Sequence, residues 1–220
     1  ETNLRCHLLL DLSGSMAFKS PRAALSKLEY AQSLAAALAY LMLQQQDAVG
    51  AMLFAERPLR YLPARAVRSH LDEVLKALGS ATPQGRTKLG PALHELAERI
   101  KRRGLIILLS DLMDSPPEVL LGLQHFRHRR HEVVVFHILD PDELDFPYTD
   151  TATFVDMESD QRLTPEPWEI AKRYRERLAA WSAHYARACR ENRIDYVRLD
   201  TRTPFDQALL AYLEKRARLL

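Results

Sequence analysis

Three oxygen-bearing side chains stand at alternate positions directly after an apolar run near the start of the chain. Asp11, Ser13 and Ser15 follow Leu8-Leu9-Leu10, a run that is typical of a buried strand. A parallel strand delivers the residues at its carboxyl end to the rim of a sheet, where open α/β folds bind ligands. One carboxylate and two hydroxyls offer hard oxygen ligands to a small dication, provided that other loops complete the coordination shell.

Two later segments are able to complete such a site. Thr87 lies in a loop that leads into a predicted helix, and Asp111 directly follows an apolar strand over 105–109. If the strands before Asp11 and Asp111 are neighbours, these side chains converge at the point where the chain direction diverges. Asp111 would then contact the metal directly or through one water, and Asp114 is a candidate for the outer shell. The predicted metal ligands are Asp11, Ser13, Ser15, Thr87 and Asp111.

This donor set favours a metal that keeps an open coordination position. Mg²⁺ prefers octahedral oxygen ligands and retains several waters, and hydroxyls are weak neutral ligands. A site with two carboxylates therefore leaves the dication electron-poor, so that an acidic side chain from a protein partner can bind it. We expect Mg²⁺, with Mn²⁺ or Ca²⁺ as alternatives, and we expect adhesion rather than catalysis.

Two other interpretations of the motif compete with the metal site. Asp and Ser after a strand often only hydrogen-bond the loop backbone, but the agreement of three separate segments disfavours this explanation. Asp11 could also be the nucleophile of a Mg²⁺-dependent phosphatase or phosphotransferase of the haloacid-dehalogenase type. That chemistry needs a second acid two residues later as general acid–base. Ser13 occupies that position, so the enzyme stays the alternative hypothesis.

A second group of candidate ligands is the histidine series near the end of a predicted helix. His125, His128 and His131 are spaced by three, which brings helical side chains near one face. Arginines are interleaved with them, and their field opposes a bound cation. The pattern indicates a solvated basic helix end that complements the helix dipole rather than a transition-metal site.

Composition limits the classes of function. The 220 residues, 47% hydrophobic, suit one well-buried globular domain, and 31 basic against 29 acidic side chains leave a net charge of +2. No overall field therefore favours nucleic acid or an anionic membrane, and no apolar stretch is long enough to span a bilayer. Two cysteines make no disulfide framework, so we expect a cytoplasmic setting. The start at Glu1, just before a core strand, indicates a piece of a longer protein.

The remaining pattern alternates apolar strands with amphipathic helices. Strands are predicted over 4–10, 48–54, 59–62, 105–109, 133–139 and 194–199, and helices begin near 27, 67, 89, 116, 168 and 204. The 59–62 strand follows a turn too short for a crossover helix, so it is predicted to be an antiparallel edge strand. The helix from 67 is expected to end in a left-handed cap at Gly79. The fold class is therefore α/β, a Rossmann-like open, mostly parallel sheet with helices on both faces.

The segment over 140–167 interrupts this alternation. It contains four prolines and several acids, and a small hairpin is predicted from 153–157 and 162–163. The segment leaves the preceding strand at the same rim as the predicted metal. It either shapes a partner-binding surface or decorates an edge, and the sequence leaves both possibilities open.

Two family resemblances follow from these residues. Asp11-Leu12-Ser13-Gly14-Ser15, Thr87 and Asp111 resemble the metal-ion-dependent adhesion site of von Willebrand factor A-type domains, and the element order is similar over 1–220. The resemblance implies a single von Willebrand factor A-like domain with an insertion at about 140–167. Leu112 departs from the pattern, because many A-type domains have Gly after this aspartate. A narrower resemblance, to the bacterial domain-of-unknown-function family fifty-eight, is carried by segments 27–31, 104–112, 139–141 and 194–197.

The narrower resemblance implies a biological setting. Members of that family carry the A-type domain in their C-terminal part and are often encoded beside MoxR-type AAA+ ATPases. It therefore implies an adapter or assembly role with such an ATPase as partner. The residues themselves indicate no nucleic-acid partner and no membrane contact from this segment.

Overall fold

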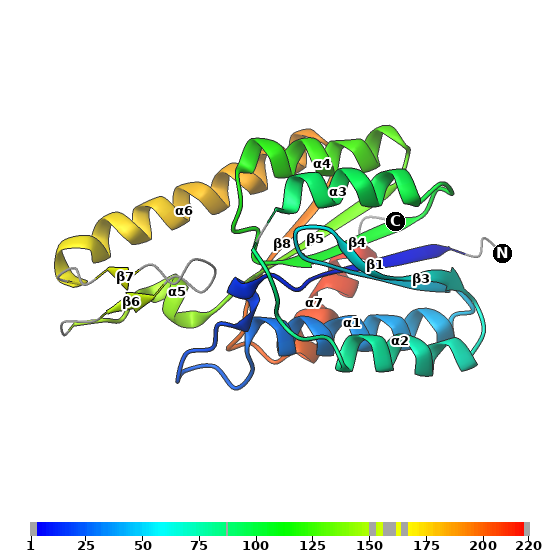
Figure 1. The fold of residues 1–220 in the computed structure, drawn as a ribbon, viewed down its shortest axis with the longest axis horizontal. Coiled ribbons are helices and arrows are strands. Elements are labelled where there is room, and N and C mark those ends of the chain that lie inside the picture. The colour runs from blue at the N-terminus through cyan, green and yellow to red at the C-terminus, as the bar shows by residue number, and fades with distance from the viewer. Residues whose placement is uncertain (1–3, 87, 150–152, 156–161, 164–166, 218–220) are drawn as a thin grey trace.

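A six-stranded sheet runs through the centre of the protein in a computed structural model, which describes residues 4–86, 88–149, 153–155, 162–163 and 167–217 (Figure 1). Its order is β3-β2-β1-β4-β5-β8, and every pairing is parallel except the antiparallel pairing of β3 with β2. The predicted α/β class and the antiparallel edge strand are confirmed. The strands are β1 (Arg5–Asp11), β2 (Ala48–Phe54), β3 (Pro58–Arg65), β4 (Leu105–Ser110), β5 (Glu132–Leu139) and β8 (Asp195–Asp200).

Helices cover both faces of the sheet. Figure 1 shows α1 (Lys27–Gln44), α2 (Ser69–Gly79) and α7 (Phe205–Ala217) on one face, and α3 (Leu89–Arg99), α4 (Pro116–His128) and α6 (Pro167–Glu191) on the other. Since successive residues of a strand face opposite sides, Leu8 and Leu10 belong to the first core and Leu9 to the second. Within the described part of the chain, no helix combines the length and apolar character needed to cross a membrane.

The central strands β1 and β4 mark the point where the chain direction diverges. The chain passes from β1 through α1 to β2 on one side, and from β4 through α4 to β5 on the other. The register pairs Leu10 with Leu109, so Asp11 and Ser110 lie side by side at the carboxyl ends of the two strands. Open α/β sheets bind ligands at such a switch point.

The irregular segment after β5 contains two small elements. The first is α5 (Pro141–Asp145), which the sequence did not predict. It begins with a capping box, because the Asp140 carboxylate accepts from the Asp142 N–H at 2.8 Å and Glu143 accepts from the Asp140 N–H at 2.8 Å. The second is the antiparallel pair β6 (Phe154–Val155) and β7 (Arg162–Leu163), which confirms the predicted strand pairing. Residues 156 and 157 of the predicted first strand lie outside the described residues. The single-domain boundary at 1–220 stays a prediction.

The left-handed cap predicted at Gly79 is wrong. Gly79 belongs to the last turn of α2, and Ser80 continues it with φ −90°. The Ser80 N–H donates to the Lys76 carbonyl at 3.1 Å and its hydroxyl to the Ala77 carbonyl at 3.4 Å. These bonds end the helix without a left-handed residue.

Candidate metal site

Asp11, the last residue of β1, is held from both sides. Its side chain is buried, and one carboxylate oxygen accepts the Ser13 backbone N–H at 2.9 Å. The other oxygen accepts the Ser110 hydroxyl at 2.5 Å. Ser110 comes from β4 and was not among the predicted site residues. The two bonds fix the orientation of the carboxylate at the rim of the sheet.

The two serines of the motif lie at the start of a short 3₁₀ helix, η1 (Gly14–Ala17). Ser13 is buried, and its Oγ lies 3.2 Å from the Oγ of Ser15. Neighbouring oxygen ligands around octahedral Mg²⁺ are about 3.0 Å apart, given metal–oxygen distances of about 2.1 Å. The two hydroxyls therefore have the spacing expected of neighbouring ligands.

Asp111 follows β4 and is fully buried. Its Oδ1 accepts the Met113 N–H at 3.2 Å, and its Oδ2 accepts the ammonium of Lys27 at 2.7 Å. The Ser15 side chain also hydrogen-bonds to Asp111. Asp11, Ser13, Ser15 and Asp111 are thus brought to one place, as the strand order requires.

Lys27 and Glu143 are, besides Ser110, site neighbours that sequence reasoning missed. Lys27 is the first residue of α1, and its ammonium contacts Glu143 at 2.6 Å as well as Asp111. Burial alone would lower the pKa of Lys27, but the two carboxylates raise it overall, so the side chain stays charged. A lysine opposes the helix dipole at the first position of a helix, and this conflict is the signal that could have pointed to it.

The Thr87 loop is tied to the Asp11 loop by main-chain bonds. Thr87 itself lies outside the described residues. On its N-terminal side, Gln84 donates its N–H to the Leu12 carbonyl at 2.6 Å, and the Gly85 carbonyl accepts the Gly14 N–H at 3.2 Å. Gly85 has φ +72°, which glycine adopts without steric penalty. These bonds bring residues 84–85, just before Thr87 in the chain, beside the Asp11 motif.

Asp114 anchors the same region from the β4–α4 loop. Its carboxylate accepts the backbone N–H groups of Leu89 at 2.6 Å and Gly90 at 3.4 Å. It thereby caps the N-terminus of α3, the helix that follows the Thr87 loop. Its role in an outer metal shell stays a prediction.

Leu112 keeps the backbone conformation that glycine favours. Its φ is +57°, in the left-handed region, and its side chain is completely buried. Its N–H donates to the Ser110 hydroxyl at 2.9 Å, and its carbonyl accepts the Asp114 N–H at 2.7 Å. The leucine that departs from the A-type pattern therefore still occupies a left-handed position.

The charges of the site favour a cation. Burial and the neighbouring charge of Asp111 raise the pKa of Asp11. Burial would also raise the pKa of Asp111, but the Lys27 ammonium lowers it overall. The cluster holds three carboxylates, of Asp11, Asp111 and Glu143, against the one ammonium of Lys27. Burial raises the pKa of Glu143 as well, so a bound dication would offset the cost of keeping Asp11 and Glu143 ionised. The three carboxyl groups and the spaced hydroxyls fit a hard dication.

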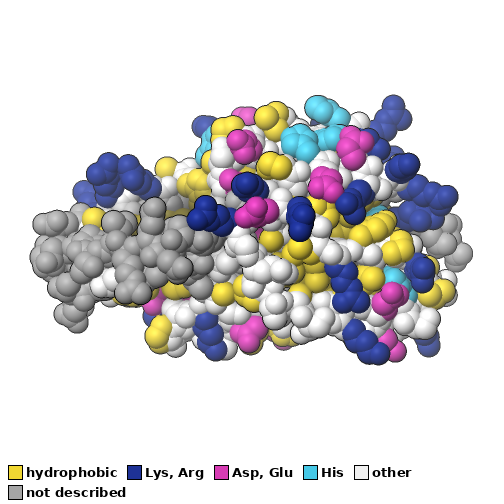
Figure 2. Space-filling view, in the orientation of Figure 1, with side chains coloured by type: hydrophobic (Ala, Val, Ile, Leu, Met, Phe, Trp, Pro, Cys, Tyr) yellow, Lys and Arg dark blue, Asp and Glu magenta, His cyan; other side chains and the backbone are white. Residues whose placement is uncertain are grey.

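The second group of candidate ligands, the histidine series, does not form a metal site among the described residues. His125 faces His94 and Glu98 on α3, whereas His131 accepts the Gly104 N–H, so the histidine series does not converge. Figure 2 shows histidines among acidic and basic side chains over α3 and α4. Within the described ranges no three His, Cys, Asp or Glu side chains gather to hold a metal ion. The candidate site accordingly needs its hydroxyls as ligands.

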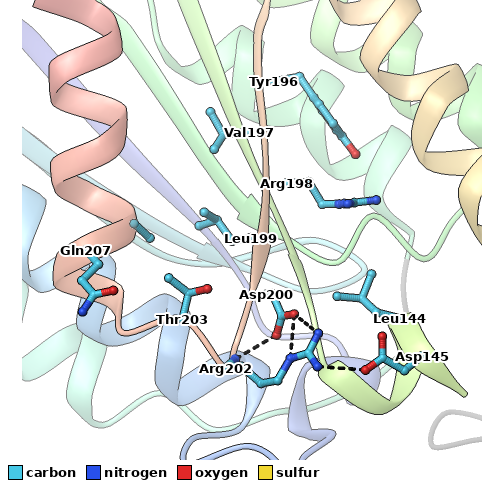
Figure 3. A pocket seen from close by; sticks show the side chains of 11 residues that line it. Leu144, Asp145, Tyr196, Val197, Arg198, Leu199, Asp200, Arg202, Thr203 and Gln207 are labelled. Atoms are coloured by element: carbon cyan, nitrogen blue, oxygen red, sulfur yellow. Dashed lines mark hydrogen bonds and ion pairs between the residues drawn. The ribbon is translucent and has the colours of Figure 1, made fainter. Parts of the chain in front are cut away.

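A hollow of about 730 Å³ lies along β8, away from the Asp11 motif (Figure 3). Leu144 and Asp145 of α5, the strand itself and the turn before α7 line it. The figure shows Arg202 between Asp200 and Asp145, with ion pairs at 2.6 Å and 2.8 Å. These contacts tie α5 to the end of β8.

Two solved bacterial structures share this architecture. BatB, a conserved hypothetical protein from Bacteroides thetaiotaomicron, is similar with a TM-score of 0.65 at 18% identity, over 98% of each chain. An aerotolerance-related membrane protein from Bacteroides fragilis NCTC 9343 gives a TM-score of 0.64 at 19% identity, over 94% of this chain and 96% of that one. These identities establish the fold alone. The chain therefore has the predicted α/β fold, which is of the von Willebrand factor A-like type.

A match to a family model assigns the chain to one family within this fold class. The family model described as "Protein of unknown function DUF58" matches residues 1–187, and the chain belongs to that family. "Uncharacterized protein Rv1480" of Mycobacterium tuberculosis and "Uncharacterized protein Mb1516" of Mycobacterium bovis are each 28% identical over 162 residues, or 72% of this chain. The match covers 50% of each relative, so the chain spans about half their length. Neither the family description nor these names state a reaction.

Proposed function

We propose that this chain is a non-enzymatic protein-interaction domain that binds Mg²⁺ and, through it, an acidic group of a protein partner. The observation that best supports the proposal is the 3.2 Å spacing of the Ser13 and Ser15 hydroxyls beside two buried carboxylates. Mn²⁺ and Ca²⁺ are the alternative ions, because they also prefer oxygen ligands. The proposed ligands are Asp11, Ser13, Ser15, Thr87 and Asp111.

Different residues of the chain would have different roles in binding the cation. Ser110 and the Ser13 N–H hold the Asp11 carboxylate in one orientation, so that it needs little reorganisation to receive a cation. Asp111 is already engaged by Lys27 and by the Met113 N–H, an arrangement that suits indirect contact through a water. A bound dication would supply a Lewis-acidic position for an external carboxylate.

The partner is proposed from chemistry and from the family. An electron-poor dication selects an acidic side chain, and the family resemblance suggests a MoxR-type AAA+ ATPase. We propose an adapter or assembly role beside such an ATPase in the cytoplasm. Since the chain spans about half of its curated relatives, their remaining parts are further candidates for partner contacts.

The phosphatase alternative has weaker support. The Asp11 carboxylate is 1% exposed, and each of its oxygens accepts a hydrogen bond, which leaves poor access for an attacked phosphoryl group. Ser13 stands where the general acid–base would be needed. A nucleophilic role for Asp11 therefore needs both rearrangement and a different acid.

Calorimetric titration of the chain with Mg²⁺ and Mn²⁺ tests the proposal. We expect saturable binding by the wild type, its loss in Asp11→Ala, and unchanged binding in the control Asp145→Asn, which removes an exposed carboxylate from α5. A pull-down from lysate with and without EDTA, using the full-length protein, then tests for a metal-dependent partner. Absence of divalent binding, or binding that survives Asp11→Ala, contradicts the proposal. Phosphatase turnover that is lost in Asp11→Asn would support the enzyme instead.

A further inference from the structure

Lys27 lies in the interior with two carboxylates around its ammonium. Its side chain is 1% exposed, and its Nζ lies 2.7 Å from Asp111 Oδ2 and 2.6 Å from Glu143 Oε1. Burying an isolated ammonium is costly, whereas two close carboxylates offset much of that cost. The contacts, rather than solvent, therefore hold this side chain in place.

Helix formation does not explain a lysine at this position. The N-terminus of α1 is already closed by a capping box in which Ser26 accepts the Glu29 N–H and Glu29 accepts the Ser26 N–H. A positive charge in the first turn opposes the helix dipole. The position of Lys27 is accounted for by its two acidic neighbours.

Glu143 extends this cluster into the segment after β5. While one of its oxygens contacts Lys27, the other accepts the Asp140 N–H at 2.8 Å. Asp140 in turn accepts the Ser20 N–H at 2.9 Å, in the loop that follows η1. A continuous series of polar contacts thus runs from the proposed metal ligand Asp111, through Lys27, to the first turn of α5.

We propose that Lys27 is a positioning residue of the metal site, and that Glu143 adjusts its effect from α5. The inference rests on the proposed function. The ammonium holds Asp111 and offsets its negative charge, so it limits how strongly the site attracts a dication. Glu143 offsets the ammonium in turn. The occupancy of the metal site and the charge at the start of the irregular segment are therefore linked.

This linkage predicts opposite effects for two neighbouring substitutions. Lys27→Met removes a positive charge and is expected to lower the Kd for Mn²⁺, on the order of tenfold. Glu143→Gln removes a negative charge and is expected to raise that Kd by a similar factor. The double variant restores the charge balance and is expected to bind close to the wild type, as is Lys27→Arg. A purely structural role would instead weaken binding in both single variants.

The experiment is a calorimetric titration of the wild type and these four variants with Mn²⁺ at pH 8. Circular dichroism checks the fold of each, and Asp145→Asn is the matched control, because it removes a carboxylate from α5 that does not contact Lys27. If Lys27→Met fails to fold, the double variant decides the question, because the linkage restores its Kd from the raised value of Glu143→Gln and a purely structural role does not. Wild-type binding with an unchanged or raised Kd in Lys27→Met, or with an unchanged or lowered Kd in Glu143→Gln, overturns this inference alone. No binding by the wild type overturns the proposed function together with it.

Discussion

The helix α5 carries two sets of ion pairs that differ in their exposure to solvent. Glu143 meets Lys27, whose side chain is 1% exposed, at 2.6 Å. Two residues further on, Asp145 meets Arg22 at 2.5 Å, where the arginine side chain is 37% exposed. It also meets Arg202 at 2.8 Å, where the arginine side chain is 41% exposed (Figure 3). The distances are alike, so distance cannot rank the two sets.

Burial is what separates them. Exposed pairs gain little, because water already solvates both charges and salt screens their attraction. A buried pair loses hydration on both sides, so removal of one partner leaves an uncompensated charge in the interior. The Lys27 cluster should therefore dominate the stability of this rim, although the Asp145 cluster has more members at the surface.

The largest expected effect comes from Lys27→Met in the metal-free protein. The substitution leaves the buried Asp111 and the partly buried Glu143 without their cation, and we expect the free energy of unfolding to fall by about 3–5 kcal/mol. Urea unfolding followed by circular dichroism measures it. If the free energy of unfolding falls no further than it does in Asp145→Asn, burial does not separate the two clusters in energy.

Glu143→Gln should have an intermediate effect. Lys27 keeps Asp111 as a partner, and the burial that raises the pKa of Glu143 offsets part of the lost contact, so we expect a loss of about 1 kcal/mol. The double variant with Lys27→Met should lose less than the sum of the two single losses, since the groups share one network. Strict additivity in urea unfolding would show that the two residues act independently.

Asp11→Asn should stabilise the metal-free chain, by about 1–2 kcal/mol at neutral pH. Burial and Asp111 raise the pKa of Asp11, so the folded chain binds a proton more tightly than the unfolded chain does. The penalty for ionising Asp11 is absent at low pH and grows as the pH rises above the usual value of 3.8. Thermal unfolding between pH 4 and pH 8 should therefore show a widening advantage of the variant, together with loss of any stabilisation by Mg²⁺. A constant difference across this range would contradict a raised pKa of Asp11.

The smallest effect is expected for Asp145→Asn. Its pairs are exposed, so the Tm should change by no more than about 3 °C at low salt, and the change should shrink in 1 M NaCl. Differential scanning calorimetry at two salt concentrations measures both quantities. By contrast, the effect of Lys27→Met should persist at high salt, since ions do not reach a buried pair.

The sequence pointed to the proposed ligands more readily than to the residues that support them. Asp11 and Asp111 each follow an apolar strand, so the parallel topology alone places them at one rim. Lys27 and Glu143 meet across 116 positions of the chain, and Lys27 and Asp111 across 84, which local patterns do not encode. The five-residue helix α5 is too short to display a hydrophobic period. The metal itself and the partner stay predictions.

Backbone conformation was harder still to predict. Glycine permits a positive φ but does not require it, and Gly79 remains in an ordinary helical turn. Leu112 takes the left-handed position instead, since its N–H bonds Ser110 and its side chain is buried in the core. Packing and hydrogen bonding in three dimensions outweighed residue preference at both positions.

Main-chain hydrogen bonds join the loop after Asp11 to the loop before Thr87, and they limit how this rim of the sheet can vary in sequence. Gly14 with Gly85, and Gln84 with Leu12, are joined through main-chain atoms. Every residue type carries those carbonyl groups, and every type except proline carries the N–H. The spacing of the loops is therefore largely independent of the side chains they display. The side chains at the proposed ligand positions can therefore be replaced without a change in the distance between the two loops.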